Sequence, residues 1–167
     1  MALKRSASEA AAAPSETLER HGRTEALWRL ERAGFLMKHS TSTIVANFGL
    51  SFSEHTTLSS LLMDNEDVPL TQTQLVELTG SSPSAMTSRI DRLEARGLVQ
   101  RAPDPRDRRA TVVRLTPAGL DLVWRALEAV DEAQQALLKD FTAEESAAFV
   151  SLLRKLTASL DFADRYA

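Results

Sequence analysis

The sequence predicts a mainly α-helical fold with one small β-hairpin, and helix-capping signals are the first reason. Three capping boxes begin at Ser51, Thr71 and Thr142, where a hydroxyl residue precedes Glu or Gln by three positions. A fourth helix start is Thr116, because Pro117 is tolerated at the first helical position. Apolar residues recur at helical spacing between these starts. Four starts that agree with the apolar spacing favour helix over most of the chain.

Four helices are predicted before the hairpin and two after it. The first is long and stops at Gly49, and two shorter ones cover about residues 52–63 and 72–79. The fourth is capped by Ser82 and ends at Gly97. In the fourth helix, Met86, Ile90 and Leu93 are predicted to form a buried stripe. Residues at helical spacing in the other long helices are Leu27, Leu30, Gly34, Met37, Ile44 and Val45 in the first, Leu120, Val123, Leu127, Val130 and Leu137 in the fifth, and Phe149, Leu152, Leu153, Leu156 and Leu160 in the sixth.

Only one region is predicted to form sheet. Residues 98–101 and 111–115 are rich in β-branched residues and flank a Pro-Asp-Pro-Arg turn. An isolated hairpin of this size is marginal in water, so it should lean on the helices or on a partner. Its tip carries Arg106, Arg108 and Arg109, which should point outward because burying unpaired charges is costly. Helix, tight turn, helix and basic hairpin together are the order of a winged helix-turn-helix.

Charge is concentrated in one part of the chain. The protein has a net charge of −3, yet residues 81–120 hold eight arginines against four acidic residues, a local +4. Residues 61–80 and 121–167 each sum to −4. A basic surface in an acidic protein is typical of a protein that meets a polyanion on one face. Charge alone leaves an arginine-rich solvated loop as the alternative.

Several classes of protein are disfavoured by composition. The absence of cysteine excludes disulfides and thiol-based redox sensing, and three scattered histidines form no recognisable zinc pattern. No cofactor is expected. No apolar run approaches the ~20 residues that span a bilayer, and no signal peptide core follows Lys4-Arg5, so we expect a cytoplasmic protein without a membrane partner. Residues 1–24 are expected to form a flexible tail.

The fourth helix is the best candidate for contact with DNA. Its exposed face is predicted to carry Ser84, Thr87, Ser88 and Arg89, whose mostly short side chains let a helix approach base edges in the major groove. Free N–H groups near Ser82 suit a phosphate. The alternative is an ordinary solvated helix, but such a face would more naturally hold Glu and Lys than weak helix formers.

At these residues the chain closely resembles the multiple antibiotic resistance regulator (MarR) family of bacterial transcription factors. The resemblance is carried by Leu70-Thr71-Gln72, Asp91-Arg92-Leu93-Glu94, Gly97-Leu98-Val99, the wing sequence Asp104-Pro105-Arg106-Asp107-Arg108-Arg109, and Leu115-Thr116-Pro117-Ala118-Gly119. About 50 residues match in motif detail, and the order of helices matches over roughly residues 25–162.

The helix over residues 82–89, paired with the basic wing, predicts double-stranded DNA with an inverted repeat as the partner. The family resemblance adds roles for the wing residues. It places Arg109 in the minor groove and gives Asp107 the role of orienting it. We expect Arg106 and Arg108 to contact phosphates. The predicted DNA-binding residues are Ser82, Pro83, Ser84, Thr87, Ser88, Arg89, Arg106, Asp107, Arg108 and Arg109. Pro83 and Ala85 depart from the residues common in relatives, so the target sequence cannot be transferred.

The resemblance also implies a homodimer, and the apolar stripes outside the lobe support one independently. We therefore expect a dimerisation helix over residues 25–50, a DNA-binding lobe over 51–116 and C-terminal dimerisation helices over 117–167. Family members usually release DNA on binding small aromatic or phenolic anions, which would make this protein a ligand-controlled repressor. Thr56 departs from the urate-responsive branch, which has an aspartate there. The predicted effector-binding residues are Trp28, Arg32, His39, Phe52 and His55.

Two other classes of function remain open from the sequence. An enzyme would need a nucleophile, a base and an orienting group in a recognisable motif, and none is found, so we do not expect an enzyme. A winged-helix module that binds proteins rather than DNA is the second alternative. It would be expected to have a neutral or acidic wing, whereas this wing is basic.

Overall fold

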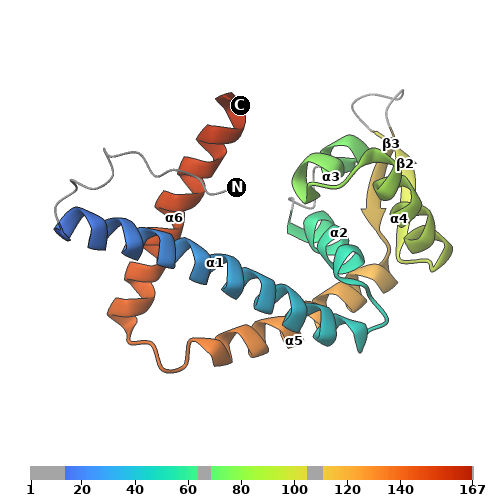
Figure 1. The fold of residues 1–167 in the computed structure, drawn as a ribbon. Helices are drawn as coiled ribbons and strands as arrows, with labels where there is room; N and C mark the ends of the chain where they lie inside the picture. Colours follow the sequence, from blue (N-terminus) through green and yellow to red (C-terminus); the bar gives the residue numbers. More distant parts are fainter. Residues whose placement is uncertain (1–13, 64–68, 105–110, 167) are drawn as a thin grey trace, which may run out of the picture. The chain divides into compact units, whose positions relative to one another are not determined.

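The computed structural model describes residues 14–63, 69–104 and 111–166. The chain divides after Phe52 into two compact units. The first contains helix α1 (Pro14–Ala46), and the second contains the small sheet and the helices that follow. The predicted mainly α fold with a winged helix-turn-helix is confirmed (Figure 1).

Helix α1 begins much earlier than the sequence predicts. The expected flexible tail over residues 1–24 is wrong for its second half, because α1 is helical from Pro14. Glu, Leu, Arg and Ala dominate residues 16–20 and 25–27, and these are good helix formers. The absence of a large apolar stripe was therefore a poor guide to disorder. The helix ends as predicted, since the Gly49 N–H donates to the Ala46 carbonyl at 2.9 Å.

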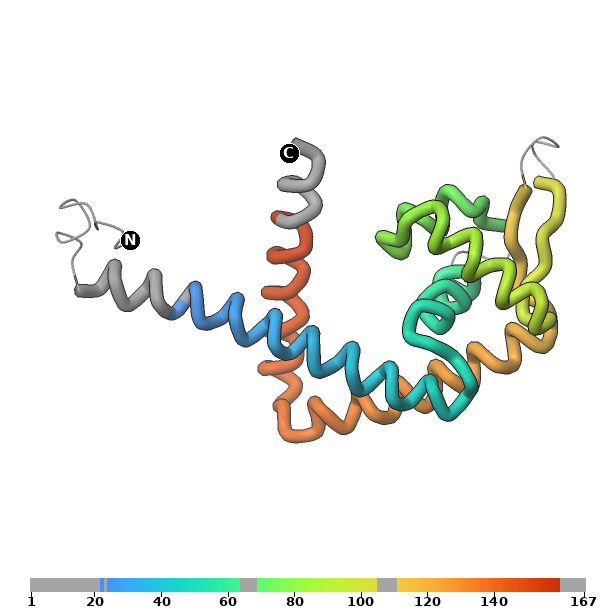
Figure 2. Tube along the Cα trace, turned by 45° about the vertical axis from the view of Figure 1, so that its right-hand side comes forward, coloured from blue at the N-terminus to red at the C-terminus, as the bar shows by residue number. Residues whose placement is uncertain are grey.

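The second unit follows the predicted order of elements. It consists of α2 (Phe52–Met63, its first residue belonging to the first unit), α3 (Gln72–Thr79), α4 (Pro83–Ala95), β2 (Val99–Pro103), β3 (Thr111–Leu115), α5 (Pro117–Leu137) and α6 (Ala143–Tyr166). Helices α3 and α4 contact each other, and α4 contacts β2 (Figure 2). Helix α5 packs on β3.

The sheet has a third strand that the sequence analysis missed. Strand β1 (Leu70–Thr71) pairs antiparallel with β3, with Leu70 opposite Val113, so the strand order is β1-β3-β2. Two residues are too short for an alternation pattern to be seen. The extra strand supports the hairpin, which would be marginally stable alone, because β3 becomes the central strand between two partners.

Most of the predicted caps are present. Thr71 and Gln74 form a complete capping box, and Thr142 and Glu145 exchange bonds of 2.9 and 3.2 Å. The Thr116 hydroxyl accepts from the Gly119 N–H at 3.0 Å. The box at Ser51 stays a prediction. These caps set where α3, α5 and α6 begin, and hence the length of the turns between them.

The core of the lobe lies between α2, α3, α4 and the sheet. As predicted, the stripe of Met86, Ile90 and Leu93 on α4 is fully buried. The other fully buried large side chains of the second unit are Leu58, Leu75, Val99, Val112, Val113 and Val123, together with Thr57. Burying this apolar surface at ~25 cal/mol per Å² is the main source of stability for the lobe.

Candidate nucleic-acid interface

The turn between α3 and α4 is held by backbone geometry and a cap. Gly80 adopts a left-handed conformation with φ of 61°, which a residue with a side chain adopts only with strain. Its N–H and that of Ser81 both bond to the Val76 carbonyl. Ser82 then caps α4 by accepting from the Ala85 N–H at 3.3 Å. The result is a turn of only three residues between the two helices.

The first two turns of α4 expose short, mostly polar side chains. Ser82, Pro83, Ser84, Thr87 and Ser88 are all exposed, as predicted. None of them is longer than three side-chain carbons, so the helix backbone itself can come close to a partner. Their exposure is confirmed, and their contact with DNA stays a prediction.

Arg89 does not belong to this exposed face. We expected it there, and that was wrong: the residue is only 7% exposed. Its guanidinium donates to the Thr57 hydroxyl at 3.0 Å and to the Ser81 hydroxyl at 3.1 Å. Desolvation by burial lowers the pKa of Arg89, the nearby positive charge of Arg92 lowers it further, and Glu54 opposes both. Arg89 thus joins α4 to α2 and to the turn before α4.

A signal for the burial of Arg89 was present in the sequence. The residue follows Met86 by three positions and precedes Leu93 by four, so it lies on the same helical face as the apolar stripe. The position of Arg89 on this stripe, rather than its charge, indicates its environment. A charged side chain on an apolar stripe is buried only with polar partners, and here two hydroxyls supply them.

Acidic residues hold the other arginines of α4 and β2. Glu54, a buried carboxylate on α2, lies 3.5 Å from Arg96 and 3.9 Å from Arg92. On β2, Arg101 pairs with Glu94 and with Asp91, the latter at 2.6 Å. Desolvation lowers the pKa of Arg101, but its hydrogen bonds to the two carboxylates outweigh this and raise it. The predicted local charge is therefore partly neutralised within the lobe.

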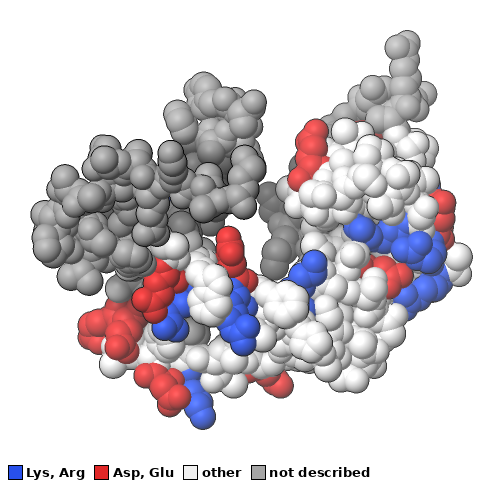
Figure 3. All heavy atoms as spheres, viewed as in Figure 1, with Lys and Arg blue, Asp and Glu red and all other residues white. Residues whose placement is uncertain are grey.

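Figure 3 shows the surface that results from these pairs. Basic and acidic side chains gather together on the α4 side of the lobe rather than forming a uniformly basic face. The sequence analysis did not identify Glu54 or Arg101 as partners. The spacing of Asp91, Glu94 and Arg101 was visible, but only the fold brings β2 alongside α4.

The wing is described only at its base. Strands β2 and β3 pair in register from Val99 with Leu115 to Pro103 with Thr111, and Asp104 beyond them is buried. The predicted wing residues Arg106, Asp107, Arg108 and Arg109 lie outside the described residues. Their expected roles in phosphate and minor-groove contact stay predictions.

The predicted effector residues have different environments. Trp28, Arg32 and His39 are exposed and share one face of α1, since separations of four and eleven residues return to the same side of a helix. Phe52 is half-buried, and the Lys38 ammonium lies 5.2 Å from its ring centroid. His55 is buried in α2, with the Ser59 hydroxyl 3.5 Å from its Nε2 atom, and burial lowers its pKa. A common site for these residues stays a prediction.

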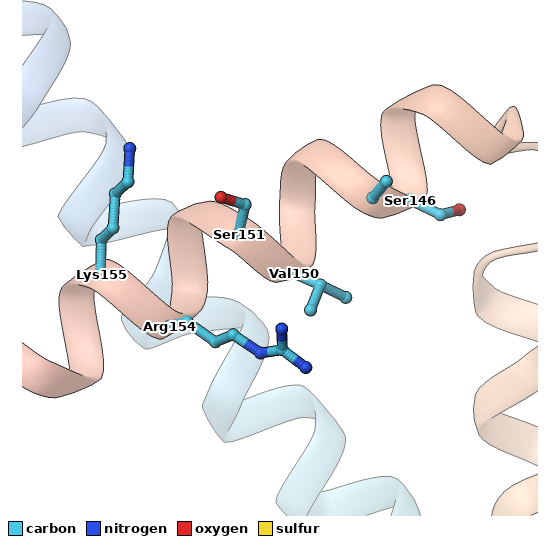
Figure 4. Close-up of a pocket in the computed structure, with 6 residues that line it drawn as sticks. Ser146, Val150, Ser151, Arg154 and Lys155 are labelled. Carbon is cyan, nitrogen blue, oxygen red and sulfur yellow. The ribbon is translucent and has the colours of Figure 1, made fainter.

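A surface hollow on α6 does not form a ligand site in a single subunit. It has a volume of about 540 Å³ and is lined by residues from α6 alone. Figure 4 shows these side chains spread along one helix. Ligand pockets in proteins bury most of the ligand between several elements, which one helix cannot do. The lining residues are Ser146, Ala147, Val150, Ser151, Arg154 and Lys155.

Two other kinds of site are absent from the described residues. Across residues 14–63, 69–104 and 111–166, no group of three or more His, Asp or Glu side chains is arranged to hold a metal ion. Within the same ranges, no helix is both long enough and apolar enough to cross a membrane.

Comparison with known proteins agrees with this geometry. Residues 48–110, which hold α2, α3, α4 and β2 and end just before β3, match the model of the MarR family. The transcriptional regulator PecS of Dickeya dadantii is 29% identical over 131 residues, which are 78% of this chain and 79% of PecS.

The chain is similar to regulators of the MarR family. A further relative is the HTH-type transcriptional repressor NicR of Pseudomonas putida, 33% identical over 54% of this chain and 58% of NicR. Among solved structures, a complex of Staphylococcus aureus MepR with DNA superposes with a TM-score of 0.69, covering 80% of this chain and 94% of MepR. At 23% identity this last match speaks to the fold alone.

Proposed function

We propose that this protein is a sequence-specific DNA-binding transcriptional regulator that acts as a homodimer on an inverted repeat. The observation that carries the proposal is the exposed face of α4, with Ser84, Thr87 and Ser88, on a helix that contacts strand β2 of a hairpin rich in arginine by sequence. Helices of this kind enter the major groove through their N-terminal residues, while a hairpin reaches the adjacent minor groove.

The N-terminus of α4 adds a place for a phosphate. Ser82 and Pro83 begin the helix at an exposed position, where the helix dipole favours an anion. Contacts of this type fix the register of a protein on DNA without reading its sequence. The wing arginines Arg106 and Arg108 would likewise contact phosphates, at a second position on the DNA backbone.

The apolar side chains outside the lobe support a dimer. Large apolar residues of α1, α5, α6 and the turn between α5 and α6 are exposed in the single subunit, some by more than half. Exposed apolar surface of this extent marks an interface, and two-fold symmetry suits an inverted repeat. We therefore assign residues 25–50 and 117–167 to dimerisation and 51–116 to DNA binding. The exposed residues are Leu27, Trp28, Phe35, Leu36, Met37, Trp124, Leu137, Leu138, Phe141, Phe149, Val150 and Leu152.

The relatives favour regulation over the alternatives. PecS is named as a transcriptional regulator and NicR as a transcriptional repressor, and the MepR structure holds the same fold on DNA. Repression is accordingly the mode of action that we propose. A winged helix that binds proteins is the second candidate. It is favoured by the ion pairs of Arg96 with Glu54 and of Arg101 with Asp91, because these pairs leave fewer positive charges available to DNA on the lobe.

Removing the wing arginine should weaken DNA binding without unfolding the protein. Arg109→Ala is expected to reduce affinity by ~1–3 kcal/mol, since an arginine in a narrow minor groove meets an enhanced negative potential. Fluorescence anisotropy on duplexes from the upstream region of the protein's own gene measures this, and two subunits should bind each duplex.

Arg125→Ala is the matched control for the wing variant. Arg125 is exposed on α5 and pairs with Asp121 at 2.9 Å. This change therefore removes the same charge from a helix outside the wing. It should leave affinity within about twofold. Equal effects of the two variants would mean that net charge, rather than the wing, determines binding.

We also propose that a small aromatic or phenolic anion releases the DNA. The support is the single face of α1 that carries Trp28, Arg32 and His39, because an aromatic ring beside cationic or titratable groups suits such ligands. A ligand that favours a spacing of the recognition helices unsuited to DNA shifts the population by its differential affinity alone.

A panel of aromatic carboxylates and phenols added to the protein–DNA complex tests this. At least one should release DNA, and His39→Ala should blunt that release while leaving ligand-free binding intact, since His39 is exposed. Ser42→Ala, a change on the same helix at a half-buried position, is the control. Release by dilute peroxide with no response to any anion would contradict the proposal.

A further inference from the structure

The hydroxyl group of Thr87 is already engaged within the protein. It donates to the Pro83 carbonyl one turn earlier at 3.0 Å. It also accepts from the side-chain amide of Gln72, the first residue of α3, at 2.5 Å. Thr87 is nevertheless exposed on the face of α4 that we assign to DNA.

These two bonds change what Thr87 can offer to a base. A hydroxyl has one proton and two lone pairs, and here the proton and one lone pair are used. Thr87 therefore has no proton left for a base acceptor such as N7 of a purine or O4 of thymine. Without breaking a bond, Thr87 can still present its methyl group and its second lone pair.

Thr87 differs in this respect from its neighbours. Ser84 and Ser88 are also exposed but have no methyl group. Ala85 carries the other exposed methyl in these turns, and no side-chain bond orients it, because alanine has none to make. Gln72 ties the Thr87 side chain to a second helix, which limits its rotamers.

We propose that Thr87 recognises thymine through methyl–methyl contact in the major groove, and that Gln72 is the positioning residue that makes this possible. This rests on the proposed function of DNA binding. Of the four bases, only thymine presents a methyl group in the major groove, so the contact distinguishes it from cytosine, which has a hydrogen there. Gln72 acts by occupying the hydroxyl rather than by touching the base.

The expected size of the effect follows from the area of one methyl. Burying one such group between protein and base is worth about fourfold in affinity, which corresponds to ~0.8 kcal/mol. With one contact in each half-site, the two together should give about sixteenfold. Such a preference is large enough to appear in selected sequences and small enough to need a direct test.

The test removes the two methyl groups separately and together. Duplexes are first selected by the wild-type dimer from a pool with a randomised centre. Each thymine in the half-sites is then replaced in turn by deoxyuridine, which lacks only the 5-methyl group. One position should show a loss of about fourfold per half-site with the wild type.

Thr87→Ser is the partner change, because serine keeps the bonds to Pro83 and Gln72 and lacks only the methyl. This variant should bind the thymine and uracil duplexes equally at that position, with the affinity of the wild type for uracil. Thr87→Val, which keeps a methyl, should still bind the uracil duplex more weakly than the thymine duplex. Gln72→Ala should reduce this difference in affinity, since the hydroxyl is then free to turn toward the base.

The outcomes separate this inference from the proposed function. No enrichment of any duplex by the wild type would contradict DNA binding itself. Enrichment with no uracil-sensitive position, or a loss that survives in Thr87→Ser, would overturn the role of Thr87 while leaving DNA binding intact. A loss that disappears only in Ala85→Gly would transfer the contact to Ala85.

Discussion

Gly119→Ala should lower the free energy of unfolding by about 3 kcal/mol or more, the largest stability effect that we expect from one methyl group. A Cβ at Gly119 would lie 1.9 Å from the Leu98 carbonyl oxygen, 2.8 Å from its carbon and 3.2 Å from its Cα. These are backbone atoms, which cannot swing aside as the tip of a side chain can. The Leu98 oxygen also accepts from the Thr116 N–H at 3.1 Å, so moving it breaks the junction of β2 with α5.

Urea denaturation at one fixed protein concentration measures this loss. Gly22→Ala is the matched control, because Gly22 is also helical and an added Cβ would meet no atom within 4 Å. That variant should be unchanged or more stable by up to ~1 kcal/mol, since alanine favours helix over glycine. Equal midpoints for the two variants would contradict the close approach of α5 to Leu98.

Arg89→Ala should lower the free energy of unfolding by ~2–4 kcal/mol. The change removes two hydrogen bonds from a charged group, to Thr57 and Ser81, and leaves a cavity at a buried position. Arg92→Ala, three residues later, removes an exposed guanidinium 3.9 Å from Glu54 and should cost less than ~1 kcal/mol. Thermal or urea unfolding of the two variants gives the comparison.

DNA binding of the same variants distinguishes the two roles considered for Arg89. If Arg89 has a structural role, the Arg89→Ala protein should be less stable than the parent. Its affinity for DNA should then recover at low temperature, where the lobe is folded. If Arg89→Ala kept the stability of the parent and lost specific DNA affinity at every temperature, then the original expectation of direct DNA contact would hold after all.

The fold was predictable from local signals because those signals agree with one another. The boxes at Thr71 and Thr142 and the cap at Ser82 are read from three or four adjacent residues, and each forms as expected. The stripe of Met86, Ile90 and Leu93 needed only helical periodicity. Because the capping residues and the apolar periodicity indicate the same helices, the helices can be predicted from the sequence.

The parts that were missed depend on contacts between distant segments. The two residues of β1 acquire strand geometry only by pairing with Val112 and Val113, some 40 residues later. Arg89 is buried because Thr57 on α2 offers it an oxygen, which no local pattern reveals. The bond from Gln72 to Thr87 likewise crosses from α3 to α4 and could not be foreseen.

The most direct test of the central claim is the salt dependence of binding to a selected duplex. If the dimer binds DNA through this lobe and its wing, then the logarithm of the affinity should fall linearly with the logarithm of salt concentration, with a slope of about −0.9 for each phosphate neutralised. A scrambled duplex should bind more weakly at every salt concentration. An affinity that does not change with salt, or that is equal for the selected and scrambled duplexes, would contradict the account.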